Sequence, residues 1–383
     1  MSVVVVTNES WLSRLGKSVI GVLFGLILFA GSFVLLFWNE GRAVQTARSL
    51  DEGLGAVVSV SPDRVDPASD HKLVHMSGGA KTDETLTDPK FGISANAVKL
   101  MRDVEMYQWQ EHQSSQTRKK LGGGTETVTV YDYNKIWSPT VINSSSFREG
   151  WHNNPTSMRF SSTTLVAQKV TVGAFRLTGE QIEKLGPAED LNVDSGMIAG
   201  REIPVLVESG GLYVHANPSS PDIGDLRIRF RVVRPGPVSL VAMQVGDSFA
   251  PYQTRAGDAL LLVEDGTKSA AEMFKSAQAQ NTVLTWVLRA VGWLVMFIGL
   301  VLSSKPLSVL GDVIPFIGSL IGAGLGIFSF FISAALSLVT IAVAWVVYRP
   351  LVGIGLLVVA AGAIVLLVTR RKRPPATAAG QGA

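Results

Sequence analysis

The 383-residue sequence contains no cysteine. This absence excludes disulfide bonds, zinc–thiolate sites, iron–sulfur clusters and thiol nucleophiles. Charged residues are also scarce, at 17% of the chain, whereas an ordinary soluble domain carries roughly 25%. The 5 histidines show neither a metal-ligand spacing nor the order of a Ser–His–Asp triad. The sequence therefore predicts a non-enzymatic protein without metal or cofactor, and segments that are buried in lipid.

The net charge of +3 is unevenly distributed. Nine of the 34 basic residues and 2 of the 31 acidic residues lie outside residues 39–282. Residues 39–282 therefore contain 25 basic and 29 acidic residues, a net charge of −4. The basic residues thus flank the apolar runs, and no basic surface for nucleic acid is predicted.

Four apolar runs are long enough to cross a bilayer core of about 30 Å, which takes about 20 helical residues. The first ends at Trp38, in the interfacial belt, with Gly41 as a helix stop. A capping box of Ser269 and Glu272 opens a helix that no breaker separates from the second run. The uncharged stretch 313–348 would be about 54 Å long as one straight helix, too long for one crossing. We therefore place a crossing near residues 328–347 and expect residues 313–327 to cross, re-enter or lie on the membrane.

Residues 39–282 are predicted to form a folded aqueous domain. Alternation of apolar and polar residues is clearest in 126–131 and 226–231, which indicates strands, and a second capping box, Thr178 with Gln181, opens a short helix. The Gly122–Gly124 triplet is expected at a hairpin tip or mobile loop. The predicted fold class is a four-helix transmembrane bundle plus a large α+β, sheet-rich extracytoplasmic domain between helices one and two.

The positive charges set an orientation. Arg14, Lys17, Lys305 and the final basic cluster fall on one side of four crossings, which is the cytosolic side by the positive-inside rule. The predicted order is as follows: cytosolic N-terminus 1–17; transmembrane helix one 18–38; extracytoplasmic or lumenal domain 39–282; helix two 283–302; cytosolic loop, glycine-rich entry and helix three 303–347; helix four 351–369; and a basic, disordered cytosolic tail 370–383.

Several collinear motifs resemble the transmembrane protein 43 family, also called LUMA. They are LLFWNEGRAV at 35–44, KLVHMSG at 72–78, DPKFGI at 88–93, VEMYQW at 104–109, GDLR at 224–227, TWVLRAVGW at 285–293 and YRPL at 348–351. The resemblance implies four membrane helices with a large domain between the first two. It also implies self-association and, in animals, membrane partners such as lamins and emerin, but no catalytic residue. The Ala- and Gly-rich tail and the lack of cysteine favour a bacterial member.

Arg289 is the most informative single residue, because an ionisable group inside a membrane helix costs a few kcal/mol unless it snorkels or is paired. Either it snorkels to the interface or it pairs with Glu40 at the end of helix one. Gly21 and Gly25 have GxxxG spacing, and Gly318 and Gly322 begin the glycine-rich segment, so all four are candidates for helix packing, although glycine is common in membrane helices anyway.

The cluster Arg370, Arg371, Lys372 and Arg373 is a stop signal, a contact for anionic lipid headgroups, or both. The favoured function is a multi-pass scaffold that self-associates and organises lipids or other membrane proteins. The alternatives are a transport or channel component and a membrane-anchored hydrolase. The favoured location is the bacterial inner membrane, or the endoplasmic reticulum or inner nuclear membrane in a eukaryote.

Overall fold

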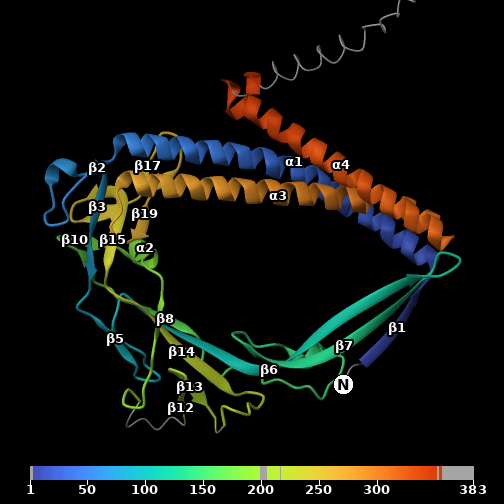
Figure 1. Ribbon diagram of the computed structural model, residues 1–383, viewed down its shortest axis with the longest axis horizontal. Helices are drawn as coiled ribbons and strands as arrows, with labels where there is room; N and C mark the ends of the chain where they lie inside the picture. The colour runs from blue at the N-terminus through green and yellow to red at the C-terminus, as the bar shows by residue number, and fades with distance from the viewer. Residues whose placement is uncertain (1–2, 199–204, 216, 352, 356–383) are drawn as a thin grey trace, which may run out of the picture. The chain divides into compact units, whose positions relative to one another are not determined.

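The computed structural model describes residues 3–198, 205–215, 217–351 and 353–355 (Figure 1). The chain divides into two compact units. We call the first the sheet unit, which comprises Met1–Glu9, Arg48–Lys120 and Thr125–Ala279, and the second the helical unit, which comprises Ser10–Ala47, Leu121–Gly124 and Gln280–Ala383.

The described residues form three long helices, one short helix, two 3-10 turns and nineteen strands. The helices are α1 Trp11–Ala56, α2 Gly179–Glu183, α3 Ala270–Gly311 and α4 Pro315–Tyr348, and the 3-10 turns are Pro67–Ser69 and Ser144–Ser146. The strands are β1 Val3–Glu9, β2 Val58–Ser59, β3 Leu73–Lys81, β4 Thr85–Thr87, β5 Ser94–Asn96, β6 Lys99–Lys119, β7 Thr125–Ser138, β8 Thr163–Val166, β9 Val170–Val172, β10 Phe175–Leu177, β11 Glu189–Leu191, β12 Leu206–Glu208, β13 Gly211–Val214, β14 Leu226–Val233, β15 Pro237–Val245, β16 Ser248–Ala250, β17 Tyr252–Gln253, β18 Ala259–Leu260 and β19 Leu262–Asp265.

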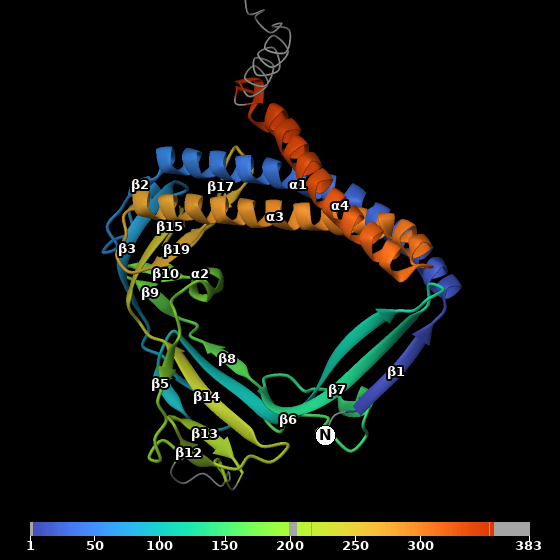
Figure 2. The ribbon, with the colours of Figure 1, turned by 45° about the vertical axis from the view of Figure 1, so that its right-hand side comes forward.

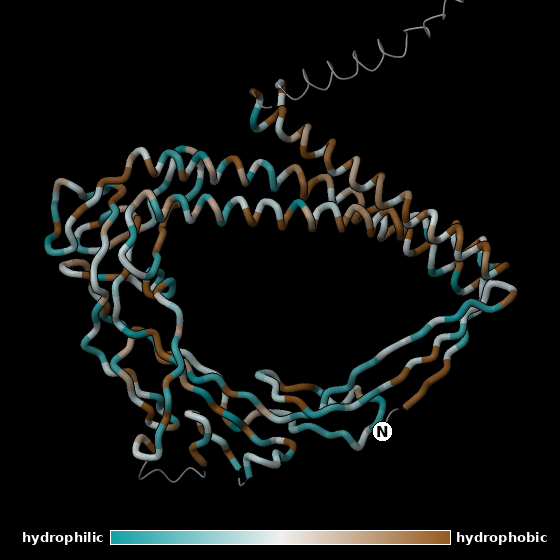
Figure 3. The backbone as a smooth tube through the Cα atoms, viewed as in Figure 1, coloured by the Kyte–Doolittle hydropathy of each residue, from teal (hydrophilic) through white to brown (hydrophobic). Residues whose placement is uncertain are grey.

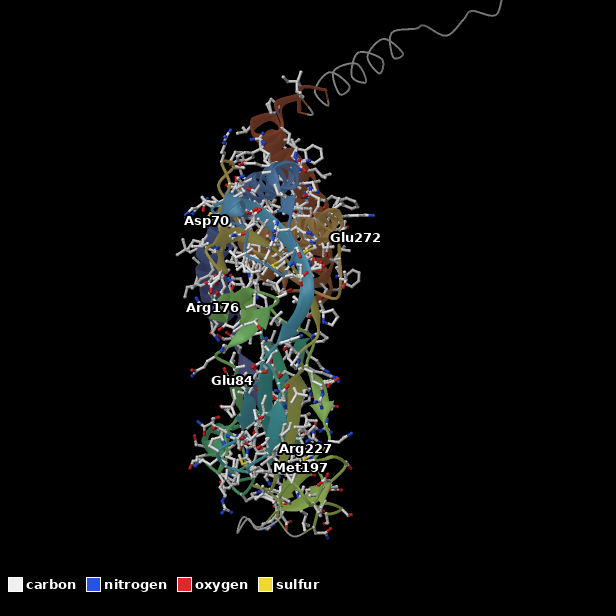
Figure 4. All side chains as sticks on the ribbon, turned by 90° about the vertical axis from the view of Figure 1, so that its left-hand side faces the viewer. Asp70, Glu84, Arg176, Met197, Arg227 and Glu272 are labelled. Carbon is white, nitrogen blue, oxygen red and sulfur yellow. The ribbon has the colours of Figure 1, made fainter. Side chains whose placement is uncertain are left out.

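The larger sheet has eight strands in the order β1-β7-β6-β14-β13-β12, with β11 added on β14 and β8 on β6. The predicted alternation in β14 is confirmed, since Leu226, Ile228 and Phe230 are buried between less buried arginines. One of these, Arg227 (labelled in Figure 4), pairs across the sheet with Glu105 at 2.5 Å. Charge on one face and apolar side chains on the other is what a sheet with one solvated face requires.

The second sheet has seven strands in the order β10-β9-β3-β15-β16, with β19 added on β15 and β2 on β3. Apolar residues of both sheets form one core, in which Phe91, Phe175 and Phe230 are almost fully buried. The capping box that opens α2 is present, because the Gln181 side chain accepts from the backbone N–H of Thr178 at 2.6 Å.

A smaller core within the sheet unit contains the last turns of α1 and the first turns of α3. Leu50 of α1 and Phe274 of α3 pack there with residues of β3, β15 and β18. A Cβ on Gly53 would lie 2.4 Å from the Leu260 side chain and 2.8 Å from the Phe274 ring, so a larger residue there would force these side chains to shift. The Ser269 capping box is also present, with the Ser269 N–H donating to Glu272 at 2.8 Å.

The helical unit contains the apolar parts of α1 and α3 and all of α4. Brown, hydrophobic colour dominates α4 and these parts of α1 and α3 in Figure 3, whereas the ends of α1 and α3 that belong to the sheet unit are paler or teal. All three helices are long and apolar enough to cross a membrane, by length and composition.

The helices differ from the prediction in their bounds. Helix α1 does not stop at Gly41 but continues to Ala56, because residues 43–56 favour helix and Leu50 anchors that end in the smaller core. Instead, Gly41 allows the Tyr348 ring to lie close to the α1 backbone, since a Cβ there would lie 2.7 Å from this ring. Helix α3 runs without interruption through both the capped segment and the second apolar run, and passes Pro306, where a loop was expected.

Helix α4 is likewise one continuous helix, and it includes residues 315–327. The fourth predicted crossing, residues 351–369, is described only at 351 and 353–355, and the tail 370–383 lies outside the described residues. The expected polar N-terminus differs most, because Val3–Glu9 is strand β1 of the larger sheet. The Gly122–Gly124 triplet is at a hairpin tip, between β6 and β7.

Candidate functional site

A buried ion pair lies at one end of the apolar part of the helical unit. Glu40 of α1 is 1% exposed, and Arg289 of α3 donates to both of its oxygens, from Nε at 2.6 Å and from Nη2 at 2.9 Å. A charge at this depth requires a partner that also satisfies its hydrogen bonds, and a bidentate guanidinium does both. The structure therefore contains the pair that the sequence offered as an alternative to snorkelling.

The third helix contributes to the same carboxylate. The Nε1–H of Trp345, in α4, donates to Glu40 at 2.7 Å. The Arg289 guanidinium also lies 4.7 Å from the ring centroid of Trp286 and 5.6 Å from that of Trp345. These aromatic faces stabilise the cation where water is excluded. We call Glu40, Arg289 and Trp345 the Glu40 cluster; it ties α1, α3 and α4 to one another.

A polar ladder extends this cluster along α1 and α3. Arg42 donates to the Asn281 side chain and to the Thr285 hydroxyl, both at 3.0 Å. Asn39 donates to the Thr285 carbonyl at 3.1 Å, and Asn281 donates to the Ala43 carbonyl at 3.0 Å. Since these groups come from both helices, the ladder fixes their register.

A second buried ion pair lies at the other end of the same helices. Arg14 of α1 donates to Asp312, just after α3, at 2.5 Å, and Asp312 is 1% exposed. Arg14 also donates to the Gly123 carbonyl, and the Trp11 indole donates to the Val309 carbonyl at 2.9 Å. We call Arg14, Asp312 and the loop Leu121–Gly124 the Arg14 cluster. Sequence reasoning treated Arg14 only as a charge that sets the topology, and it missed the pair with Asp312.

Between the two clusters the helices make close contacts at glycine. A Cβ on Gly25 would lie 2.7 Å from the Gly299 carbonyl oxygen, whereas one on Gly21 would meet nothing within 4 Å. A Cβ on Gly318 would clash with Asp312, and one on Gly322 would lie 3.0 Å from the Ser308 hydroxyl oxygen. The structure thus places Gly25, Gly318 and Gly322 at close contacts within the unit and leaves Gly21 on an open face.

The remaining candidates give no further site. The basic residues 370–373 lie outside the described residues. Among the residues that the structure describes, no group of three or more His, Asp or Glu side chains is arranged to hold a metal ion. An open apolar groove of about 650 Å³ lies between α1 and α4, lined by residues such as Phe37, Val343 and Tyr348.

Three long apolar helices, ion pairs buried between them and a sheet-rich unit define a membrane protein with a folded sheet domain. Comparison with known proteins gives its family. The model of the Transmembrane protein 43 family matches residues 106–350, and the chain belongs to this family.

Relatives match along most of the chain. Transmembrane protein 43 of Mus musculus is 39% identical over 372 residues, which cover 90% of each chain. The Homo sapiens protein is 38% identical over 359 residues, which cover 90% of this chain and 88% of the human one. Transmembrane protein 43 homolog of Drosophila melanogaster is 33% identical over 353 residues, which cover 88% of this chain and 92% of the fly protein. No solved structure matches.

Proposed function

We propose that the chain is a non-enzymatic membrane scaffold that self-associates and organises lipids or other membrane proteins around its sheet unit. The helical unit provides the lipid contact, since large apolar side chains such as Phe24, Ile27 and Phe331 are 65%, 67% and 66% exposed. Exposed apolar surface of this extent is stable only against lipid or protein. The absence of cysteine continues to favour a bacterial inner membrane; in a eukaryote the endoplasmic reticulum or inner nuclear membrane is the alternative.

The observation that carries self-association is the outer edge of β1. This strand ends the larger sheet, and no described strand pairs with its outer side. Its side chains Val4 and Val6 are 57% and 53% exposed. An uncovered, apolar edge strand offers backbone hydrogen bonds and side-chain contacts to a second copy of the same strand.

A channel receives no comparable support from the described helices. The hydroxyl groups of Ser303, Ser333 and Thr340 each donate to a carbonyl of their own helix, three or four residues earlier. Hydroxyls that are satisfied in this way do not line a polar path.

Native mass spectrometry and crosslinking of the purified full chain in detergent test the proposal. We expect oligomers, and we expect them to weaken when Val4→Glu and Val6→Glu are introduced together. Thr7→Glu is the matched control, because it adds a negative charge to the same strand without removing an exposed valine. A wild-type chain that is strictly monomeric in detergent and in nanodiscs would refute self-association.

A further inference from the structure

One face of the larger sheet carries aromatic and charged side chains instead of core residues. The strands that carry this face follow one another in the order β7, β6, β14, β13 and β12 (Figures 1 and 2). In β14 buried residues alternate with arginines, so the apolar side chains lie on the core face and the arginines on the solvated face. All five strands belong to the sheet unit.

Trp137 of β7 lies at the centre of an aromatic cluster on the solvated face. Its partner across the sheet is Tyr107, and the two ring centroids are 5.1 Å apart. The Tyr213 ring meets the indole edge to face at 6.1 Å, and the Arg227 guanidinium lies 4.7 Å from the indole centroid. Arg227 is itself paired with Glu105 at 2.5 Å. Two rings and a paired cation therefore hold this half-buried indole as a rigid apolar platform.

A hollow of about 200 Å³ opens beside this indole. Its walls include Trp137 from β7, Glu208 at the end of β12 and Arg229 from β14. Pro218 and Pro221, in the loop that precedes β14, complete the wall. Pockets for drug-sized ligands measure roughly 300–1,000 Å³. This hollow therefore suits a single small ring.

The proline wall is fixed by a buried carboxylate. The side chain of Asp225 is 4% exposed and accepts hydrogen bonds from the Tyr213 hydroxyl and, at 2.9 Å, from the Asp222 N–H. His215 Nδ1 lies 2.9 Å from its other oxygen. These contacts order residues 217–225 before any ligand arrives, which lowers the entropy cost of binding.

Glu208 and Arg229 bring opposite charges to the hollow. Both side chains are exposed, and neither forms a hydrogen bond or an ion pair with a residue that the structure describes. The third charged residue of the wall, Arg227, is balanced by Glu105. The charges of the site therefore cancel, whereas a site for a polyanion requires an excess of positive charge. A ligand that uses both free groups must offer hydrogen-bond donors and acceptors beside an apolar surface.

We propose that the hollow binds one sugar ring of a glycan, whose C–H face packs on Trp137 while its hydroxyls bind Glu208 and Arg229. Each hydroxyl both donates and accepts, so it can donate to the carboxylate and accept from the guanidinium. Neighbouring hydroxyls on a ring match the two-pronged geometry of both charged groups. The hollow does not include β1, so this site is independent of the proposed self-association.

Saturation-transfer difference NMR on the full chain tests this site. The chain is placed in phosphatidylcholine nanodiscs, because the headgroups of maltoside detergents are themselves sugars and would compete. The probes are methyl pyranosides of neutral hexoses and N-acetylhexosamines, and oligosaccharides built from them. We expect transfer to at least one of these sugars, strongest at the C–H protons of one ring face. No transfer to any of them would overturn the proposal.

Two exposed positions separate binding from folding. Trp137→Ala also removes ring contacts, so Glu208→Gln and Arg229→Gln are the decisive variants. We expect each to raise the Kd of the best sugar about tenfold or more, with an unchanged circular dichroism spectrum and Tm. Arg118→Gln is the matched control, because it removes an exposed arginine of β6 that lies outside the hollow.

Two results with these variants would contradict a sugar site. One is a Kd that neither Glu208→Gln nor Arg229→Gln changes relative to the control. The other is displacement of the sugar by acetate or inorganic phosphate, with binding lost in Arg229→Gln and retained in Glu208→Gln. That pattern would show an anion site, since only the guanidinium would then contribute.

Discussion

Loss of either partner of the Glu40–Arg289 pair should destabilise the helical unit, and the two losses should be unequal. Arg289→Ala leaves a carboxylate that is 1% exposed with only the Trp345 donor. Removing one member of a buried ion pair costs about 3–5 kcal/mol, because the remaining charge stays desolvated. Glu40→Ala leaves an arginine whose side chain is 15% exposed and rests on two tryptophan rings. We expect about 1.5–3 kcal/mol for that change, the usual value for hydrogen bonds to a charged group.

The double variant measures the interaction energy between Glu40 and Arg289 separately from the effect of losing each side chain. With both charges removed, no isolated charge remains, so the combined loss should be smaller than the sum of the single losses by about 1–3 kcal/mol. Reversible unfolding of the full chain in detergent, followed by tryptophan fluorescence and circular dichroism, measures all four free energies.

Lys305→Ala is the matched control for this cycle, because it removes an exposed cation from the same helix. We expect it to change stability by less than about 0.5 kcal/mol. Strictly additive single losses would refute the pairing argument, and so would a loss for Arg289→Ala no larger than that of Lys305→Ala.

Three further predictions concern other sites. Gly25→Ala should destabilise the helical unit by about 1–3 kcal/mol in the same unfolding assay, because its Cβ would meet the facing backbone at 2.7 Å, whereas Gly21→Ala should be neutral or stabilising. Asp312→Ala should lower stability and, because Arg14 also holds the hairpin tip, should increase proteolysis within residues 121–124; unchanged cleavage would count against this contact. Burial lowers the pKa of His152 below its ordinary value of 6.5, so stability should be lost as the pH falls from 6.5 towards the lowered pKa, and a melting temperature independent of pH in that window would refute this.

The sign of the His152 prediction follows from proton linkage. The unfolded chain takes up a proton at a higher pH than the folded chain, because the folded side chain is 2% exposed between stacked Tyr133 and Trp151 rings. The Glu149 carboxylate opposes the shift without cancelling it. His152→Gln should therefore remove the dependence, and the exposed His71, changed in the same way, is the control.

Much of the local structure could be predicted from residues close in the sequence. The capping boxes at Thr178 and Ser269 and the alternation in β14 depend on spacings of two to four residues, and the structure contains all three. The predicted helix stop at Gly41 was wrong, because glycine there serves contact with the Tyr348 ring. Composition alone could not distinguish these two uses of glycine.

The candidate site, too, could be predicted from the sequence only in part. The need of Arg289 for a partner followed from the cost of a charge in an apolar run, and Glu40 was the nearest acidic residue at that end. Trp345 and the Arg14–Asp312 pair were not foreseen, since a tryptophan at a membrane interface and charges beside apolar runs have ordinary local explanations.

The sequence by itself determined that this protein has long helices apolar enough to cross a membrane, a sheet-rich part and an arginine that must be paired. These follow from apolar run length, from alternation and from the cost of desolvating charge, which all act over short stretches of chain. Only the tertiary structure decided that residues 3–9 pair with β7 and that the tip of the β6–β7 hairpin meets the start of α1. Such pairings join segments far apart in the chain and depend on strand register and packing, which no local pattern specifies.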